Sequence, residues 1–266
     1  MEKKRIFSPI YLTLVLILMY LPIVIVVLYA FNANTSRFTF NFTGFSLQYF
    51  EGLLQDTKGL MDALWKSLEV ALYSCLSALV LGVTGAIGMA NSKFRGQGLI
   101  ESVSLLPVMI PEIILAIAYM AVFKAVELRG DMLKLVLTHT TFCVPYIYLV
   151  VKARLVGMDP SLTEAARDLG ASPIRAFKDV TLPLIMPGVL SGLMLAFAMS
   201  MDDFVISFFV RDTLETLPTK IYSSVKMGVS LQVNALCTLM LAVVALIVGI
   251  SRVLSSKNEV KNYDYK

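Results

Sequence analysis

The chain has 266 residues, of which 57% are hydrophobic and 16% are charged, with a formal net charge of +4 at pH 7. With a mean hydropathy of +0.76, this composition excludes an ordinary soluble domain, in which apolar residues are fewer and spread through amphipathic elements. The Lys and Arg residues stand at the ends of long apolar runs, so the positive charge indicates membrane topology and not nucleic-acid binding. We therefore predict an all-α integral membrane protein.

Six apolar runs are long enough to cross a bilayer, whose hydrocarbon core takes about 20 residues of helix. The predicted spans are residues 10–31, 68–90, 100–123, 132–151, 184–210 and 233–254. An even number of spans places both termini on one side. If that side is the cytoplasm, the cytoplasmic segments hold the majority of the 23 Lys and Arg residues, as the positive-inside rule requires. We predict one transmembrane domain, residues 1–266, with both termini cytoplasmic.

The first apolar run follows the basic segment Lys3, Lys4 and Arg5 and could be mistaken for a secretory signal. It is longer than the apolar core of a signal peptide, which has about 7–15 residues, and no clean small-residue cleavage site follows it. We therefore predict an uncleaved first span.

Two predicted spans carry acidic residues at depths where a bilayer makes them costly. Glu112 lies in the third span between apolar residues, and Pro107 and Pro111 beside it predict a broken or kinked helix that lines a cavity. Asp202 and Asp203 lie in the outer half of the fifth span, with no Lys or Arg in the adjacent turns. An intramembrane carboxylate is a candidate functional residue by default.

These three carboxylates, Asp202, Asp203 and Glu112, are predicted to line a substrate pathway for an organic cation. Adjacent residues of a helix point about 100° apart, so both aspartates cannot face a pore squarely, and one of them can pair with a neighbouring subunit instead. Four aromatic residues could add cation–π contacts to the amines of such a cargo. They are Tyr119, Tyr146, Phe204 and Phe208.

Metal-ligating and nucleophilic patterns are absent from the sequence. His139, the single histidine, lies among threonines, which favours a hydrogen-bonded structural residue over a proton relay. Cys75, Cys143 and Cys237 lie in apolar runs without C-x-x-C spacing, so we interpret them as packing residues and predict neither a disulfide nor a metal site. No G-x-x-x-x-G-K-[ST] phosphate loop occurs, so we predict no catalytic residues and no ATP hydrolysis by this chain.

The long cytoplasmic segment, residues 154–183, contains the pattern of a short amphipathic helix. This helix is predicted to start at a capping box, Ser161 to Glu164, or at Asp159 followed by proline. Gly170 can take the left-handed conformation that ends it, and Ser172 with the following proline restarts a helix. Its apolar face consists of Leu162, Ala165, Ala166 and Leu169.

A short helix of this kind suits a groove on a soluble partner. The pattern alone leaves open a second interpretation, an amphipathic connection that rests on the membrane surface.

The residues of this segment resemble the EAA loop of ABC importer permeases. The resemblance rests on Glu164, Ala165, Ala166, Gly170, Val180, Leu182 and Pro183, of which only Val180 departs, since the motif has Ile there. It implies the type I ABC importer fold and a loop that inserts into a cleft of a cytoplasmic ATPase. Glu164 would contact the ATPase, the two alanines would permit close approach, and Gly170 would make the turn. The chain itself would bind no cofactor, because ATP and Mg would be bound by the partner ATPase.

Four segments, residues 31–38, 137–145, 195–203 and 220–230, resemble the PotC-like family of spermidine/putrescine importer permeases, and the similarity runs over nearly the whole chain. It implies a bacterial inner or cytoplasmic membrane and three kinds of partner. These are a second permease subunit (PotB-like), two copies of a cytoplasmic ATPase (PotA-like) and an extracytoplasmic polyamine-binding protein (PotD-like).

Other classes of protein fit the sequence less well. An ABC permease for another solute, such as a metal ion, keeps the architecture and changes only the cargo. An ion-coupled secondary transporter would ordinarily need internal repeats or more spans and would have no use for the EAA loop. A membrane-embedded enzyme would need a cluster of catalytic or metal-binding side chains.

Overall fold

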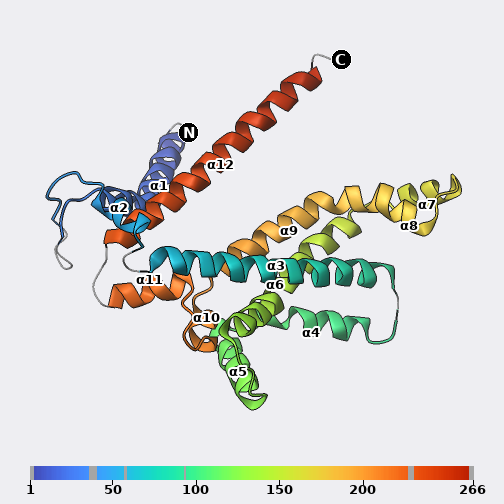
Figure 1. Cartoon of the computed structure of the whole chain (residues 1–266). Helices are drawn as coiled ribbons and strands as arrows, with labels where there is room; N and C mark the ends of the chain where they lie inside the picture. The colour runs from blue at the N-terminus through green and yellow to red at the C-terminus, as the bar shows by residue number, and fades with distance from the viewer. Residues whose placement is uncertain (1–2, 36–40, 57–58, 93, 227–230, 264–266) are drawn as a thin grey trace. The chain divides into compact units, whose positions relative to one another are not determined.

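The computed structural model describes residues 3–35, 41–56, 59–92, 94–226 and 231–263 (Figure 1). These residues form helices and one isolated antiparallel bridge between Asn32 and Phe45, and they include no strand. Five of the helices are long and apolar enough to cross a membrane, and a bent pair provides a sixth crossing if it is counted as one span. Two segments that carry the family resemblance, 31–38 and 220–230, extend beyond the described residues, as does Met1 of the basic N-terminal segment.

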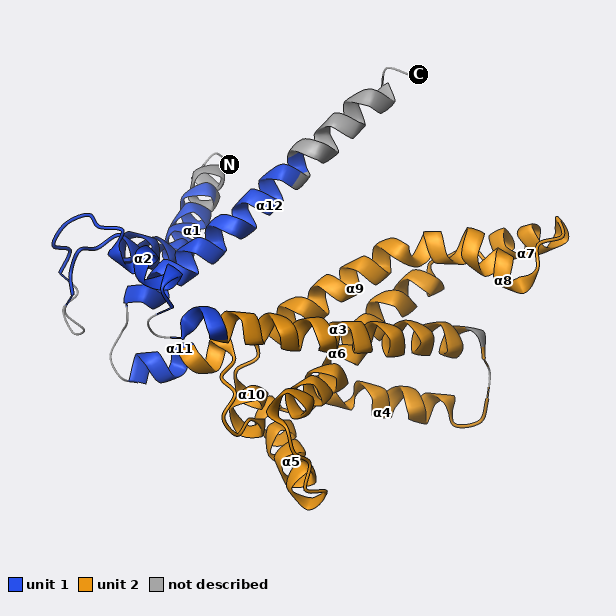
Figure 2. Cartoon of the chain, viewed as in Figure 1, with its two compact units in different colours: residues 1–62, 221–266 blue, residues 63–220 orange. Residues whose placement is uncertain are grey.

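The chain separates into two compact units, Met1–Asp62 with Ile221–Lys266 and Ala63–Lys220 (Figure 2). In the first unit α1 (Lys3–Ala30) and α2 (Gln48–Leu54) both pack against α12 (Leu231–Tyr263). Within Pro9–Ala30 of α1, Ala30 is the one buried residue. Most of this unit's apolar surface is therefore left for lipid or for another protein chain.

The second unit contains the helices that form the candidate sites. In chain order they are α3 (Leu60–Asn91), α4 (Gln97–Met109), α5 (Glu112–Ala125), α6 (Asp131–Val156), α7 (Ser161–Asp168), α8 (Pro173–Ala176), the π-helical segment η1 (Phe177–Thr181), α9 (Leu182–Asp202), α10 (Val205–Val210) and α11 (Leu217–Lys226), of which α3 begins and α11 ends in the first unit.

Helix α6 is the centre of the second unit, because 61% of its apolar stretch is buried. Small residues on its neighbours let the backbones approach closely. A Cβ added at Gly82 of α3 would lie 2.9 Å from the Cβ of Ile147, and one added at Gly192 of α9 would lie 3.2 Å from the Ile147 Cα. In a bilayer, where burial of apolar surface gives helices no net attraction, such close van der Waals packing holds them together.

Two of the predicted spans are interrupted. The third consists of α4 and α5, which bend by 108° at Ile110 and Pro111, as the prolines of the sequence predict. The fifth was expected to be one helix over residues 184–210, and this is wrong at its C-terminal end. Helix α9 ends at Asp202, Asp203 is extended with φ −64° and ψ 116°, and α10 begins only at Val205.

The helix that contains the fifth span begins before residue 184. The described residues Pro173–Asp202 form a helical stretch of 30 residues, in which η1 connects α8 to α9. The predicted Ser172 start is confirmed, because the Ser172 Oγ accepts a hydrogen bond from the Arg175 backbone N–H at 3.3 Å. The segment that follows α7 and the C-terminal end of α9 are thereby joined by a nearly continuous helix.

The close approach at Gly82 can be tested against a second glycine of α3. Gly82→Ala should destabilise the purified chain in detergent by about 1–3 kcal/mol, because the new methyl group overlaps Ile147. Gly88→Ala should stabilise the chain by about 0.5–1 kcal/mol, since nothing lies within 4 Å of that Cβ and Ala is the better helix former. Thermal unfolding followed by circular dichroism measures both. Equal shifts for the two variants would contradict the packing described.

Candidate functional site

A cavity of about 260 Å³ lies in the second unit at the two helix breaks. It brings together the three acidic residues that the sequence singles out, Glu112, Asp202 and Asp203. The break between α4 and α5 provides Glu112, and the break between α9 and α10 provides both aspartates. The other lining residues are Pro107, Leu115, Phe142, Tyr146, Met199, Phe204, Val205 and Ile206.

The two adjacent aspartates have different surroundings. Asp202 is exposed, as is Glu112, and neither side-chain carboxylate has a hydrogen bond or ion pair with another described residue. Asp203 is 8% exposed and is fully engaged inside the chain. Because the helix ends between them, their different environments follow from backbone geometry and not from the 100° spacing of a continuous helix.

Asp203 caps the short helix α10. Its Oδ1 accepts a hydrogen bond from the Ile206 N–H at 3.2 Å, and its Oδ2 accepts one from the Ser207 N–H at 2.8 Å. The Oδ2 also lies 3.4 Å from Nε2 of His139 in α6. A helix break inside a membrane frees backbone N–H groups that lipid cannot satisfy, and Asp203 satisfies two of them.

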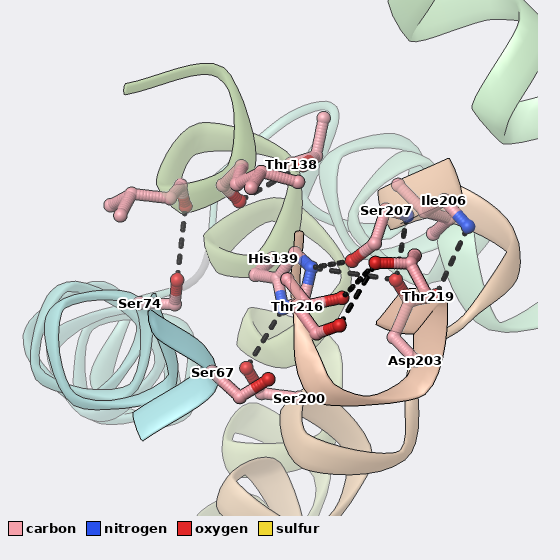
Figure 3. A network of polar contacts seen from close by, with 12 residues as sticks. Ser67, Ser74, Thr138, His139, Ser200, Asp203, Ile206, Ser207, Thr216 and Thr219 are labelled. Carbon is pink, nitrogen blue, oxygen red and sulfur yellow. Dashed lines mark hydrogen bonds and ion pairs between the residues drawn. The ribbon is translucent and has the colours of Figure 1, made fainter. Parts of the chain in front are cut away.

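His139 is 1% exposed and is hydrogen-bonded on both sides (Figure 3). Its Nδ1 lies 2.8 Å from the Ser200 Oγ, and its Nε2 lies 3.0 Å from the Ser207 Oγ. The expectation of a hydrogen-bonded histidine is confirmed. The sequence did not indicate that His139 is the partner of Asp203, because the two belong to different spans.

The cavity is built to attract positive charge. Its lining includes three carboxylates and no Lys or Arg among the described residues. Helix α9 points its C-terminal end at the break, where the last backbone carbonyls of a helix carry a partial negative charge. Of the four aromatic residues predicted to contact amines, Tyr146 and Phe204 line the cavity, whereas Tyr119 and Phe208 do not. Phe208 instead packs against Arg211, whose guanidinium carbon lies 5.8 Å from the centroid of the Phe208 ring.

A further acidic residue, Glu101 of α4, was not singled out from the sequence. It forms an ion pair with Lys152 of α6, whose ammonium lies 5.7 Å from the Tyr148 ring centroid. The pairing could have been expected, because both residues stand near the cytoplasmic ends of adjacent predicted spans.

Residues 154–183, predicted to be cytoplasmic, contain the predicted short helix α7, but its N-terminal cap differs from the predicted capping box. Ser161 is the first helical residue, and the Asp159 Oδ1 accepts its backbone N–H at 3.0 Å. This hydrogen bond lowers the pKa of the Asp159 carboxyl below its ordinary value. Of the two starts considered, the one at Asp159 is therefore formed and the capping box is not. At the other end Gly170 has φ +88°, which confirms its left-handed turn.

The residues of the predicted ATPase-coupling loop lie in two places. Glu164, Ala165 and Ala166 are on α7, while Leu182 and Pro183 begin α9. Glu164 and Ala165 are exposed. The apolar face of α7 is not covered within the chain, since Leu162 is 47% and Leu169 is 89% exposed.

Glu164 also borders a second cavity, of about 480 Å³, in the second unit. Its lining residues come from the ends of α3 and α6 and from the segment between α6 and α9. They are Ala90, Leu155, Met158, Pro160, Thr163, Glu164, Arg167, Pro173, Ala176, Phe177 and Thr181.

Residues 78–258 match the family of binding-protein-dependent transport system inner membrane components, and the chain belongs to this family. The spermidine/putrescine transport system permease protein PotC of Escherichia coli (strain K12) is 38% identical over 229 residues, which cover 86% of each chain. The putrescine transport system permease protein PotI of the same strain is 36% identical over 237 residues, which cover 86% of this chain and 84% of that one.

The fold is that of an ABC importer permease. A chain in the crystal structure of a bacterial ABC transporter that imports the acidic polysaccharide alginate matches with a TM-score of 0.72, over 96% of this chain and 98% of that one. At a sequence identity of 12%, this match shows the fold alone. The chain is a multi-pass membrane permease and a transport subunit of the ABC importer class.

The different environments of the adjacent aspartates predict different effects on stability. Asp203→Ala should destabilise the purified chain by about 1–3 kcal/mol, because two backbone N–H groups and His139 lose their acceptor. Asp202→Ala should change the stability by less than about 0.5 kcal/mol, since it has no partner to lose among the described residues. Thermal unfolding in detergent compares them, and an equal loss in both variants would show that Asp203 does not cap α10.

Proposed function

We propose that the chain is a permease subunit of an ATP-driven polyamine importer that carries spermidine or putrescine. In this proposal residues 1–266 form one transmembrane domain in a bacterial inner or cytoplasmic membrane, with six spans and both termini cytoplasmic. The observation that carries the cargo assignment is the cavity at the two helix breaks, where Asp202 and Glu112 are exposed beside aromatic rings. The names of the relatives PotC and PotI support the same cargo.

A polyamine is a flexible chain of methylene groups that separate charged ammonium groups. Each ammonium donates charge-assisted hydrogen bonds to carboxylates, and Asp202 and Glu112 approach the cavity from two different helix breaks. The rings of Phe142, Tyr146 and Phe204 offer cation–π contacts and apolar surface to the methylene segments. The carbonyl groups at the C-terminal end of α9 supply further acceptors, as interrupted helices do in other transporters.

Coupling to ATP hydrolysis is assigned to the cytoplasmic segment. Glu164, Ala165, Ala166 and Gly170 would dock in a cleft of a cytoplasmic ATPase, of which the importer holds two copies, and ATP and Mg would bind there. The exposed apolar residues of α7 support this docking. Leu182 and Pro183 would transmit the movement, because the helical stretch Pro173–Asp202 connects the docking segment to Asp202.

The chain supplies half of a pathway in this proposal, and a second permease of similar architecture supplies the other half. A polyamine-binding protein would deliver the cargo from outside. Closure of the ATPase dimer would then open the cavity outward to receive it. The chain would bind no cofactor of its own.

Neutralising the exposed carboxylates should impair polyamine uptake. In cells that produce the complete transporter, Asp202→Asn and Glu112→Gln should each lower the uptake of labelled spermidine at low concentration by about tenfold, the effect of losing one charge-assisted contact. Glu127→Gln is the matched control, because Glu127 is exposed and does not line the cavity. Uptake at the wild-type level by both cavity variants would exclude the site. A wild-type complex that imports a metal ion and no polyamine would establish the alternative cargo.

Reversing the charge at Glu164 should uncouple transport from ATP hydrolysis. Glu164→Lys should abolish uptake and lower co-purification of the ATPase, because the exposed α7 carboxylate is replaced by a longer cation in the docking face. Asp179→Lys makes the same charge change in the same cytoplasmic segment, where Asp179 is exposed and paired with Arg175, and should retain most of the uptake. If the Glu164 variant imports spermidine normally, the docking role is wrong.

A further inference from the structure

The imidazole of His139 touches both sides of the break between α9 and α10. Ser200, on its Nδ1 side, belongs to the last turns of α9, and Ser207, on its Nε2 side, belongs to α10. Asp203, at the non-helical joint itself, also lies on the Nε2 side. Figure 3 shows the histidine between these three partners, which come from consecutive parts of the chain. One side chain of α6 therefore spans the joint.

The hydrogen-bonding roles around the ring are mutually consistent. Asp203 accepts from two backbone N–H groups and, as a carboxylate, can only accept. In the neutral imidazole a proton on Nε2 serves Asp203 and the Ser207 hydroxyl, and Nδ1 is then free to accept from the Ser200 hydroxyl. The Asp203 carboxylate, the His139 imidazole and the hydroxyls of Ser200 and Ser207 thus all have partners at the joint, as polar groups at membrane depth require.

This arrangement leaves Asp202 as the available carboxylate of the pair. Asp202 is the last residue of α9 and directly precedes the fixed Asp203. The direction in which Asp202 points is therefore set by the backbone at the joint. Phe142, one turn after His139 on α6, has its ring centroid 5.0 Å from that of the histidine and lines the same cavity.

We propose that His139 is a positioning residue for cargo binding: it holds the joint at Asp203 so that Asp202 stays directed into the cavity. The inference rests on the proposed function for the identity of the cargo. In this proposal the buried His139 does not touch the cargo, but it determines how tightly the transporter binds the cargo. Without the imidazole, Ser200, Ser207 and Asp203 lose a shared partner, and Asp202 loses its fixed direction.

Two substitutions of similar size separate positioning from packing. Gln places an amide near the site of Nε2, so His139→Gln keeps a donor toward Asp203 and Ser207, whereas His139→Leu fills the space and keeps none. In the complete transporter, His139→Leu should raise the spermidine concentration for half-maximal uptake by about tenfold or more. His139→Gln should raise it by less than about threefold. The maximal rate for each assembled complex should stay within about twofold of wild type in both.

A double-mutant cycle tests whether His139 acts through Asp202. In an Asp202→Asn background, His139→Leu should add less than about twofold to the half-maximal concentration, because interacting residues do not have additive effects. The inference is overturned if Leu and Gln give the same value, or if the effect of Leu persists undiminished in that background. If the Leu variant does not assemble, Ser207→Ala takes its place with the same expected result. Ser191→Ala is its control, since the Ser191 hydroxyl bonds only within α9, to the Pro187 carbonyl.

A measurement independent of the cargo separates this inference from the proposed function. Asp202→Cys, in a chain whose three native cysteines are replaced by Ala, can be labelled by a water-soluble thiol reagent. Its labelling rate should change by about fivefold or more with His139→Leu and by less than about twofold with His139→Gln. An unchanged rate overturns the positioning role. If His139→Leu changes the labelling rate and the wild-type complex imports no spermidine, the positioning role is supported and the proposed cargo is refuted.

Discussion

Two helices are broken in the second unit, and a bilayer requires that every backbone group freed by such a break finds a partner. At the break between α9 and α10, Asp203 meets this requirement for the N–H groups of Ile206 and Ser207, and His139 contacts the hydroxyls of Ser200 and Ser207. Because the chain's own partners use Asp203, its neighbour Asp202 is left exposed beside Glu112 in a cavity. The need to satisfy the freed backbone groups, which makes the break energetically unfavourable, thereby also produces an acidic site.

The packing of α6 explains why the break can be held in place. Helix α6 is largely buried, and glycines of α3 and α9 let it approach both helices closely around Ile147. A rigid central helix fixes the position of His139, and His139 in turn reaches the joint. The helical stretch Pro173–Asp202 extends from the predicted docking segment to the cavity. In the proposed mechanism, movement of α7 reaches the cavity through this stretch.

The sequence predicted the class of fold, and it singled out the three acidic residues that line one cavity, because both features are expressed in composition and depth. Runs of about 20 apolar residues identify spans by length alone, and an unneutralised carboxylate inside such a run is conspicuous. The bend near Pro111 was also predictable, since proline removes a backbone donor.

The end of α9 at Asp202 was not predictable, because no proline or glycine marks it. The sequence also does not distinguish an aspartate that caps a helix, such as Asp203, from any other aspartate. The pairing of Asp203 with His139 joins two spans and is a property of tertiary packing. The cap of α7 at Asp159 was one of two starts that the sequence allowed, and the pattern alone did not choose between them.

The central claim is that the cavity at the two breaks receives the cargo, and protection from chemical labelling tests it most directly. Val205 lines the cavity and bears none of the proposed contacts, so Val205→Cys in a chain without other cysteines reports on occupancy while Asp202 and Glu112 remain in place. In the complete transporter in lipid, saturating spermidine should slow the labelling of this cysteine by a small thiol reagent by about fivefold or more, as expected for an occupied site. A labelling rate that spermidine does not change, in a complex that still transports it, would contradict the account.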